Sequence, residues 1–163
     1  MTATPGEMFD RHHLAIYRYL LKMTGSREAA EELTQDVFLR VVRSAPSYDD
    51  RSLERAWLFR IARNLRIDNA RRERRAPDVT PIDTDEPSEP GRQALQLGLR
   101  QALAMLPDDE REAFVLAEVV GLSYVEIAAA SSATPAAVRS RIYRARMQLR
   151  ATLDAPAAGK PFV

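Results

Sequence analysis

Apolar residues recur at helical spacing along most of the chain, and no segment shows the two-residue alternation of a strand. We therefore predict an all-α fold. The first helix should run from about Pro5 to Met23, with Gly25 just beyond its end, and Ser26 should cap the second. The predicted apolar face of the first helix comprises Phe9, His13, Ile16, Tyr17 and Leu20. That of the second comprises Ala30, Leu33, Val37, Phe38 and Val41.

A third long helix is predicted across "SLERAWLFRIARNLRIDNARRERR", after an interruption that begins at Pro46. Its apolar face comprises Leu53, Trp57, Leu58, Ile61, Ala62 and Leu65. Several arginines, Asn64 and Asp68 lie beside or opposite this face. Three helices of this length can bury one small core, so we predict a first domain over residues 5–76.

Helical periodicity stops after Ala76. Residues 77–92 carry one basic and five acidic side chains, and they include Pro77, Pro81, Pro87 and Pro90. Proline breaks a helix interior, and like charges repel one another along an extended chain. We therefore predict a flexible, acidic, proline-rich linker between two small helical domains.

The second domain is predicted over residues 93–155, followed by a tail at 156–163. Its first helix repeats leucine at positions 95, 99, 103 and 106, and a further helix opens at Pro107 and Asp108 and stops at Gly121. Ser123 and Glu126 form a capping box that starts a short helix, and Thr134 caps the last helix. The inward face of that last helix comprises Val138, Ile142, Ala145, Leu149 and Leu153.

The net charge is only +1, but the basic residues are concentrated in two patches. The second patch, from Val138 to Arg150, holds five arginines and no acidic residue. A short helix, a tight turn and a basic second helix make the helix-turn-helix arrangement, whose second helix can lie in the major groove of DNA. The absence of acidic neighbours in the sequence favours DNA binding over an ordinary helical hairpin. The first patch, around Trp57 to Arg75, contains Phe59 and Asn64 beside its arginines. Aromatic and amide side chains among basic residues are a weaker signal, for binding single-stranded DNA. Trp57 is more typical of a core residue than of a stacking platform.

Composition narrows the function classes. The chain has no cysteine, so it offers no disulfide or thiolate metal site, which fits the cytoplasm. His12 and His13 are adjacent and cannot form a spaced metal pair on one helix face, so we expect no metal. No apolar run approaches the roughly 20 residues of a membrane span, and the N-terminus lacks the pattern of a signal peptide. Without a nucleophile–base pair, a metal cluster or a Gly-rich phosphate loop, we expect neither an enzyme nor a cofactor.

Three segments, in this order, carry a resemblance to a known family: "AEELTQDVFLRVVR", "AWLFRIARNLRIDNARRERR" and "LPDDEREAFVLAEVVGLSYVEIA…VRSRIYRARMQL". They resemble a bacterial RNA polymerase sigma factor of the extracytoplasmic-function (ECF, group IV) family over most of residues 10–153. The resemblance implies a sigma-two domain that binds core polymerase and melts the minus-ten element, and a sigma-four domain that recognises the minus-thirty-five element. It also implies the partners: the β′ clamp helices and β flap of core RNA polymerase, promoter DNA and an anti-sigma factor. The free protein should be a cytoplasmic monomer without direct membrane insertion.

The resemblance assigns roles to individual residues. Polymerase binding falls to the "ELTQD" segment and its neighbours, namely Glu32, Leu33, Gln35, Asp36 and Arg40. Minus-ten DNA binding falls to Tyr48, Arg51, Trp57, Arg60, Arg63, Asn64, Asp68, Arg71 and Arg72. Minus-thirty-five DNA binding falls to Thr134, Arg139, Ser140, Arg141, Tyr143, Arg144 and Arg146.

The turn before the last helix departs from the family. It reads Ser131-Ser132-Ala133-Thr134 where the family typically has Leu-Gly-Ile-Ser, so it lacks a glycine and two aliphatic side chains. We expect a strained turn and packing weakened by a few kcal/mol.

Two other functions stay open beside the sigma factor. One is a sigma-mimicking adaptor that sequesters an anti-sigma factor, which the altered turn favours and the basic patch opposes. The other is a polymerase-independent helix-turn-helix repressor, which would have no use for the "ELTQD" segment.

Overall fold

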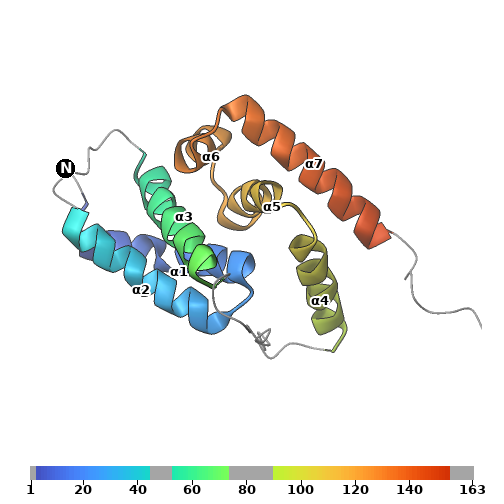
Figure 1. Cartoon of the computed structure of the whole chain (residues 1–163), viewed down its shortest axis with the longest axis horizontal. Coiled ribbons are helices and arrows are strands. Elements are labelled where there is room, and N and C mark those ends of the chain that lie inside the picture. The colour runs from blue at the N-terminus through green and yellow to red at the C-terminus, as the bar shows by residue number, and fades with distance from the viewer. Residues whose placement is uncertain (1–2, 45–52, 74–89, 155–163) are drawn as a thin grey trace, which may run out of the picture.

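The computed structural model describes residues 3–44, 53–73 and 90–154, and every regular element in these ranges is a helix (Figure 1). The first domain contains α1 (Pro5–Thr24), α2 (Arg27–Ser44) and α3 (Glu54–Glu73). The second contains α4 (Pro90–Ala104), α5 (Asp108–Phe114), the π-helical turn η2 (Val115–Val120), α6 (Tyr124–Ser131) and α7 (Pro135–Asp154). The predicted all-α fold is confirmed.

The predicted linker lies outside the described residues as far as residue 89, so its flexibility stays a prediction. Helix α4 begins at Pro90, inside the range predicted for the linker. Proline is tolerated in the first turn of a helix because its missing N–H has no intrahelical partner there. None of the helices in the described ranges is long and apolar enough to cross a membrane.

Local sequence signals set the helix ends of the described chain. Gly25 ends α1 in the left-handed conformation, with φ 68°. The predicted capping box of α6 is present, with the Ser123 N–H donating to Glu126 over 3.0 Å and the Glu126 N–H donating to Ser123 Oγ over 3.1 Å. Thr134 caps α7 as predicted, because its hydroxyl accepts from the Ala137 N–H over 3.1 Å.

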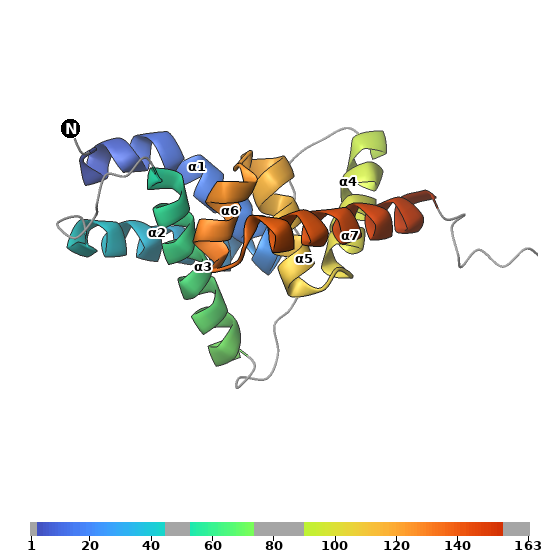
Figure 2. The same ribbon diagram turned by 90° about the horizontal axis from the view of Figure 1, so that it is seen from above.

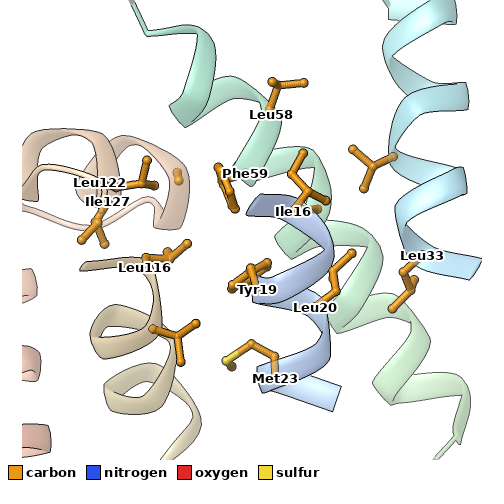
Figure 3. Packing of buried hydrophobic residues seen from close by; sticks show 14 of the residues in the cluster. Ile16, Tyr19, Leu20, Met23, Leu33, Leu58, Phe59, Leu116, Leu122 and Ile127 are labelled. Atoms are coloured by element: carbon orange, nitrogen blue, oxygen red, sulfur yellow. The ribbon is translucent and has the colours of Figure 1, made fainter. Parts of the chain in front are cut away.

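One continuous hydrophobic core joins the two domains (Figure 3). Helix α1 packs against α2 and α3 and also against η2, while α6 packs on α3, as the view from above shows (Figure 2). Tyr19 and Phe59 are buried and meet edge to face, with ring centroids 5.6 Å apart. Leu116, Leu122 and Ile127 of the second domain belong to the same core. The core that three helices were predicted to bury alone therefore extends into the second domain.

The predicted apolar faces are confirmed for α2 and shifted in α1. All five predicted residues of α2 are buried. In α1 the buried face instead includes Met8 and Tyr19, while Phe9 is 43% exposed and Tyr17 lies partly buried at the edge of the core. The shift follows from packing: α1 contacts η2 as well as α2 and α3, so its apolar face turns towards the second domain.

The faces of α3, α4 and α7 were only partly predicted. In α3, Phe59 is buried against Tyr19 of α1, and Arg66 is buried against Tyr19 and Glu112. Leu53, just before α3, is 39% exposed. Of the leucines that recur along α4, Leu95 and Leu99 are exposed, and Leu153, which was predicted to face inwards from α7, is exposed as well. Leu103 and Leu106 do pack, in a smaller cluster with Ala145 and Leu149 of α7.

Candidate nucleic-acid interface

The outer side of α2 carries the residues predicted to bind polymerase. Leu33 is buried and anchors the helix in the core. The predicted polar residues are all exposed on the other side of α2: Glu32, Gln35, Asp36 and Arg40. The arrangement is a polar surface on a firmly packed helix, which suits docking to another macromolecule.

The residues predicted to bind the minus-ten element divide into two sets along α3. Asn64, Asp68, Arg71 and Arg72 are exposed, and Trp57 is partly buried against the core. Tyr48 and Arg51 lie outside the described residues. Phe59, considered with Trp57 as a possible stacking residue, is 1% exposed and belongs to the core.

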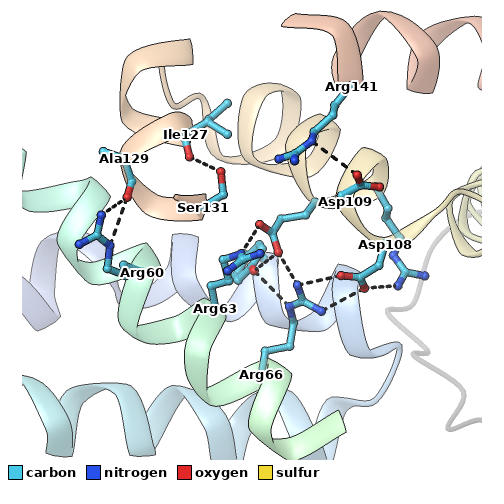
Figure 4. Close-up of polar contacts among 12 residues, drawn as sticks. Arg60, Arg63, Arg66, Asp108, Asp109, Ile127, Ala129, Ser131 and Arg141 are labelled. Atoms are coloured by element: carbon cyan, nitrogen blue, oxygen red, sulfur yellow. Dashed lines mark hydrogen bonds and ion pairs between the residues drawn. The ribbon is translucent and has the colours of Figure 1, made fainter. Parts of the chain in front are cut away.

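The other set turns towards the second domain (Figure 4). The Arg60 guanidinium donates from Nε and Nη2 to the carbonyl oxygen of Ala129 in α6. Arg63 Nε donates to Glu112 of α5 over 2.7 Å. These two predicted DNA-binding residues therefore already have acceptors within the chain.

Beside them lies a polar cluster that joins the domains, with Tyr19, Arg66 and Glu112 buried at its centre and Arg63 and the exposed Asp108 at its edge. Arg66 is 5% exposed and Glu112 is 3% exposed. The Arg66 guanidinium pairs with Glu112, donates to Tyr19 Oη over 3.1 Å and lies 3.2 Å from Asp108 Oδ1. The Tyr19 hydroxyl in turn donates to Glu112 over 3.3 Å. A buried ion pair is tolerated when such additional hydrogen bonds satisfy it.

The cluster shifts the acid–base equilibria of its members. Burial raises the pKa of Tyr19, and the charge of Glu112 acts in the same direction. Burial on its own lowers the pKa of Arg66, but Tyr19, Glu112 and Asp108 outweigh it, so the pKa is raised. Burial likewise raises the pKa of Asp108, but Arg66 and Arg111 outweigh burial and hold this pKa below its ordinary value. The phenol is therefore neutral, and the guanidinium and the Asp108 carboxylate are charged, at neutral pH.

Helix α7 carries the residues predicted to bind the minus-thirty-five element. Thr134, Arg139, Ser140 and Tyr143 are exposed. The other predicted residues are arginines that form ion pairs with α5 or η2: Arg141 with Asp109 at 3.5 Å, Arg144 with Glu110 at 2.9 Å, and Arg146 with Glu118. The patch has no acidic neighbours in the sequence, but in the folded chain α5 and η2 place carboxylates beside it. The predicted absence of acidic neighbours is therefore wrong.

The acidic helix α5 is the feature that sequence analysis missed. Four of its seven residues are carboxylates. Asp108 and Glu112 pair with arginines of α3, whereas Asp109 and Glu110 pair with arginines of α7. Figure 4 shows Asp108 beside Arg66 and Asp109 beside Arg141. The run "DDERE" was the available signal, but its pairing with two separate arginine sets depends on the packing of α5 between α3 and α7.

The unusual turn between α6 and α7 has the expected strain. Ser132 lies in the left-handed region with φ 53°, where a side chain is disfavoured. Ser131 is buried, and its hydroxyl donates to the Ile127 carbonyl over 2.6 Å. The Ala133 N–H donates to the Ala128 carbonyl over 3.0 Å. The turn therefore satisfies its polar groups by hydrogen bonding in place of aliphatic packing.

The histidines and acids of the described ranges form no group of three or more that could hold a metal ion. His12 Nε2 lies 2.8 Å from Glu54 Oε2, and His13 Nδ1 lies 2.7 Å from the Phe9 carbonyl oxygen. The His12 ring therefore links α1 to α3, whereas the His13 ring forms its hydrogen bond within α1.

This two-part arrangement, with an exposed polar side on α2, a basic helix and a helix-turn-helix, corresponds to two known families. Residues 8–76 match Sigma-70 region 2, and residues 96–149 match Sigma-70 region 4. The chain belongs to the extracytoplasmic-function family of RNA polymerase sigma factors.

Curated relatives agree with that assignment. The chain is 40% identical over 153 residues to ECF sigma factor SigE of Mycolicibacterium smegmatis, covering 88% of this chain and 59% of SigE. It is 32% identical over 157 residues to ECF sigma factor SigM of Bacillus subtilis, covering 91% of this chain and 94% of SigM. The chain thus spans less than two thirds of SigE but nearly all of SigM.

Solved structures extend the likeness to the arrangement of both domains. The sigma factor RpoE of Bartonella quintana, in complex with the anti-sigma factor NepR, matches with a TM-score of 0.80 and 27% identity over 91% of this chain and 95% of RpoE. CnrH, in complex with the cytosolic domain of CnrY, matches with a TM-score of 0.74 and 30% identity over 94% of this chain and 89% of its own.

Proposed function

We propose that this sigma factor binds core RNA polymerase in the cytoplasm, directs it to specific promoters and helps to open the DNA, acting by binding and not as an enzyme. The observation that carries the proposal is the presence of both sigma regions, in order, on one chain whose α2 has an exposed polar side. Glu32, Gln35 and Asp36 would contact the β′ clamp helices, and the second domain would contact the β flap.

The DNA contacts divide between the domains. Arg60, Asn64 and Asp68 of α3 would face the melted minus-ten strand, where flipped bases need pockets and phosphates need cations. The exposed N-terminal part of α7, with Arg139 and Ser140, would enter the major groove at the minus-thirty-five element.

Control by an anti-sigma factor is the second part of the proposal. Its support is the likeness to RpoE, which was solved in complex with NepR and matches over 91% of this chain. Free of such a partner, the chain would be a monomer.

The test is transcription in vitro with core polymerase from the organism of origin and a genome-wide template set. We expect promoter-specific transcripts, and the transcript start sites would yield the promoter motif. The double variant Gln35→Ala, Asp36→Arg should lower polymerase affinity with its fold intact. Absence of specific transcripts from every template would overturn the proposal.

A sigma-mimicking adaptor is the second candidate, favoured by the three α7 arginines that already pair with carboxylates. The double variant Arg139→Ala, Arg144→Ala separates the two functions. It should abolish transcription by a sigma factor, whereas it should leave the binding of an anti-sigma partner by an adaptor unchanged. A polymerase-independent repressor would instead keep its DNA binding in the α2 double variant.

A further inference from the structure

A polar contact links the first turn of α3 to α1, and none of the proposed polymerase or DNA contacts uses it. Glu54 is the first residue of α3. His12 Nε2 lies 2.8 Å from Glu54 Oε2, and Arg11 Nη1 lies 3.3 Å from the same oxygen. A carboxylate only accepts hydrogen bonds, so the imidazole N–H at Nε2 is the donor. The contact joins two helices of the first domain across 42 residues of sequence.

We infer that His12 is a positioning residue for minus-ten recognition: through Glu54 it holds the first turn of α3, which carries Trp57, in place against α1. The inference rests on the proposed function in one respect, the role of α3 as the helix that contacts the minus-ten element. The link between α1 and α3 itself stands on the geometry of the His12–Glu54 contact.

His12 fixes the position of Glu54 more closely than Arg11 does. The side chains of His12 and Glu54 are 12% and 19% exposed, whereas that of Arg11 is 55% exposed. Arg11 also lies 3.9 Å from Glu7, so its guanidinium is shared between two carboxylates. An exposed ion pair is weak and restrains a long side chain poorly, whereas a hydrogen bond that is shielded from water is stronger. The main constraint on Glu54 therefore comes from the imidazole.

Apolar packing gives the first turn of α3 little directional constraint. Leu53, just before the helix, is 39% exposed, and the buried Ala56 has only a methyl side chain. The large buried side chains of this helix begin further along, at Leu58 and Phe59. Apolar contact is non-directional, whereas a hydrogen bond has a preferred distance and angle. The bond from His12 therefore sets where this end of α3 lies.

This bond also relates the proposed DNA-binding helix to the proposed polymerase-binding surface. Trp57 follows Glu54 by three residues, about one helical turn, and is partly buried against the core. Helix α1 in turn packs on α2, where Phe9 meets Phe38 edge to face with ring centroids 4.9 Å apart. A binding residue needs a neighbouring shell that keeps it in its productive position. His12 and Glu54 provide such support for Trp57.

The two adjacent histidines offer a matched comparison. His12→Ala removes the bond to Glu54, whereas His12→Gln is the conservative variant, because the glutamine amide can still donate to the carboxylate. His13→Ala makes the same truncation one residue later, where the ring bonds to the Phe9 carbonyl oxygen within α1. Glu54→Gln keeps the size of the side chain and replaces a charge-assisted bond by a neutral one. Circular dichroism checks that each full-length variant keeps its helix content.

The first readout is the fluorescence of Trp57, measured on the full chain. It is the single tryptophan of the sequence, so no label is needed. In His12→Ala the emission should shift to longer wavelength and quenching by acrylamide should increase, because water reaches the indole when the turn is no longer held. His12→Gln and His13→Ala should keep the values of the unmodified chain. Glu54→Gln should change in the same direction as His12→Ala, by a smaller amount.

The second readout is discrimination by the holoenzyme formed from the full chain and core polymerase. Its affinity is measured for a promoter fragment, taken from the mapped start sites, and for the same fragment with the minus-ten element replaced. His12→Ala should lower the ratio of the two affinities on the order of tenfold, the scale of one hydrogen bond to a charged group. His12→Gln should restore the ratio, and affinity for core polymerase should not change. A merely stabilising residue would lower the free energy of unfolding and leave this ratio unchanged in the folded protein.

The positioning role is overturned if His12→Ala, while folded, leaves both the fluorescence of Trp57 and the affinity ratio as they are. It is also overturned if His13→Ala has the same effect as His12→Ala, or if His12→Gln restores neither readout. Promoter transcription by the unmodified chain tests the proposed function separately. Transcripts with an unchanged Trp57 signal in His12→Ala would refute only the positioning role. A changed signal without transcripts from the unmodified chain would support the link between α1 and α3 and refute the proposed function.

Discussion

The two basic helices differ in how their arginines are paired. Helix α3 pairs Arg63 and Arg66 with carboxylates of the other domain, and their side chains are 27% and 5% exposed. Helix α7 pairs Arg144 and Arg146 with carboxylates of its own domain, and these side chains are 56% and 53% exposed. Exposed pairs contribute little and exchange readily with other anions. The α7 pairs can therefore exchange with other anions within one domain, whereas the α3 pairs link the two domains.

The largest expected effect separates the two kinds of pair. Glu112→Ala leaves Arg66 buried without its closest carboxylate and should destabilise the chain by about 3 kcal/mol. Glu110→Ala removes the partner of the exposed Arg144 and should cost about 1 kcal/mol or less. Urea unfolding followed by circular dichroism measures both. Equal decreases in the free energy of unfolding of the two variants would mean that the buried ion pair contributes no more to stability than the exposed one.

The next effect concerns the turn that supports α7. Ser132→Gly removes the cost of placing a side-chain residue in the left-handed region, and should stabilise the second domain by about 1 kcal/mol. Neither basic helix is altered, so thermal unfolding should shift upwards while the domain distance stays the same. Ser132→Ala is the control, since alanine keeps the strain. A destabilised glycine variant would show that the serine side chain supports this turn.

Acid should open the α3 side. Burial raises the pKa of Glu126, but hydrogen bonds from Arg55 and Ser123 outweigh it and hold this pKa below its ordinary value, as Arg66 does for Asp108. A carboxylate with a lowered folded pKa stabilises the fold above its ordinary pKa of about 4. That contribution is lost as the pH falls through the lowered value. Energy transfer between fluorophores attached at Glu28→Cys of α2 and Met147→Cys of α7 should therefore decrease below about pH 4. Arg55→Ala should shift the midpoint of this transition to higher pH.

The smallest effect is expected on α7. Glu118→Gln frees Arg146 from an exposed pair, so stability should change by less than about 0.5 kcal/mol. Affinity for duplex DNA should rise by no more than about twofold, because little energy held the pair together. Fluorescence anisotropy with a labelled duplex measures the affinity. A tenfold rise would show that the Arg146–Glu118 pair holds α7 strongly, and the contrast between the exposed and the buried ion pairs would disappear.

Local features of the chain were predictable because they depend on neighbouring residues. The capping box of α6, the cap at Thr134 and the buried face of α2 all follow from spacing within one helix. In α1, Ile16 and Leu20 are buried as predicted, but Met8 and Tyr19 are buried where Phe9 and Tyr17 were expected, because periodicity cannot tell which helices will cover a face. Phe59 was treated as a possible stacking residue for the same reason.

The amino-acid sequence by itself determined the helices, most of their ends, the two basic patches and the family resemblance, because each of these depends on residues that are close together in the sequence. Only the tertiary structure decided which carboxylate meets which arginine. Arg66 and Glu112 stand 46 residues apart, and a net charge or a local charge count holds no information on such a pair. The packing of α5 between α3 and α7 brings the charges together, because the shared core around Tyr19 and Phe59 sets how the two domains meet.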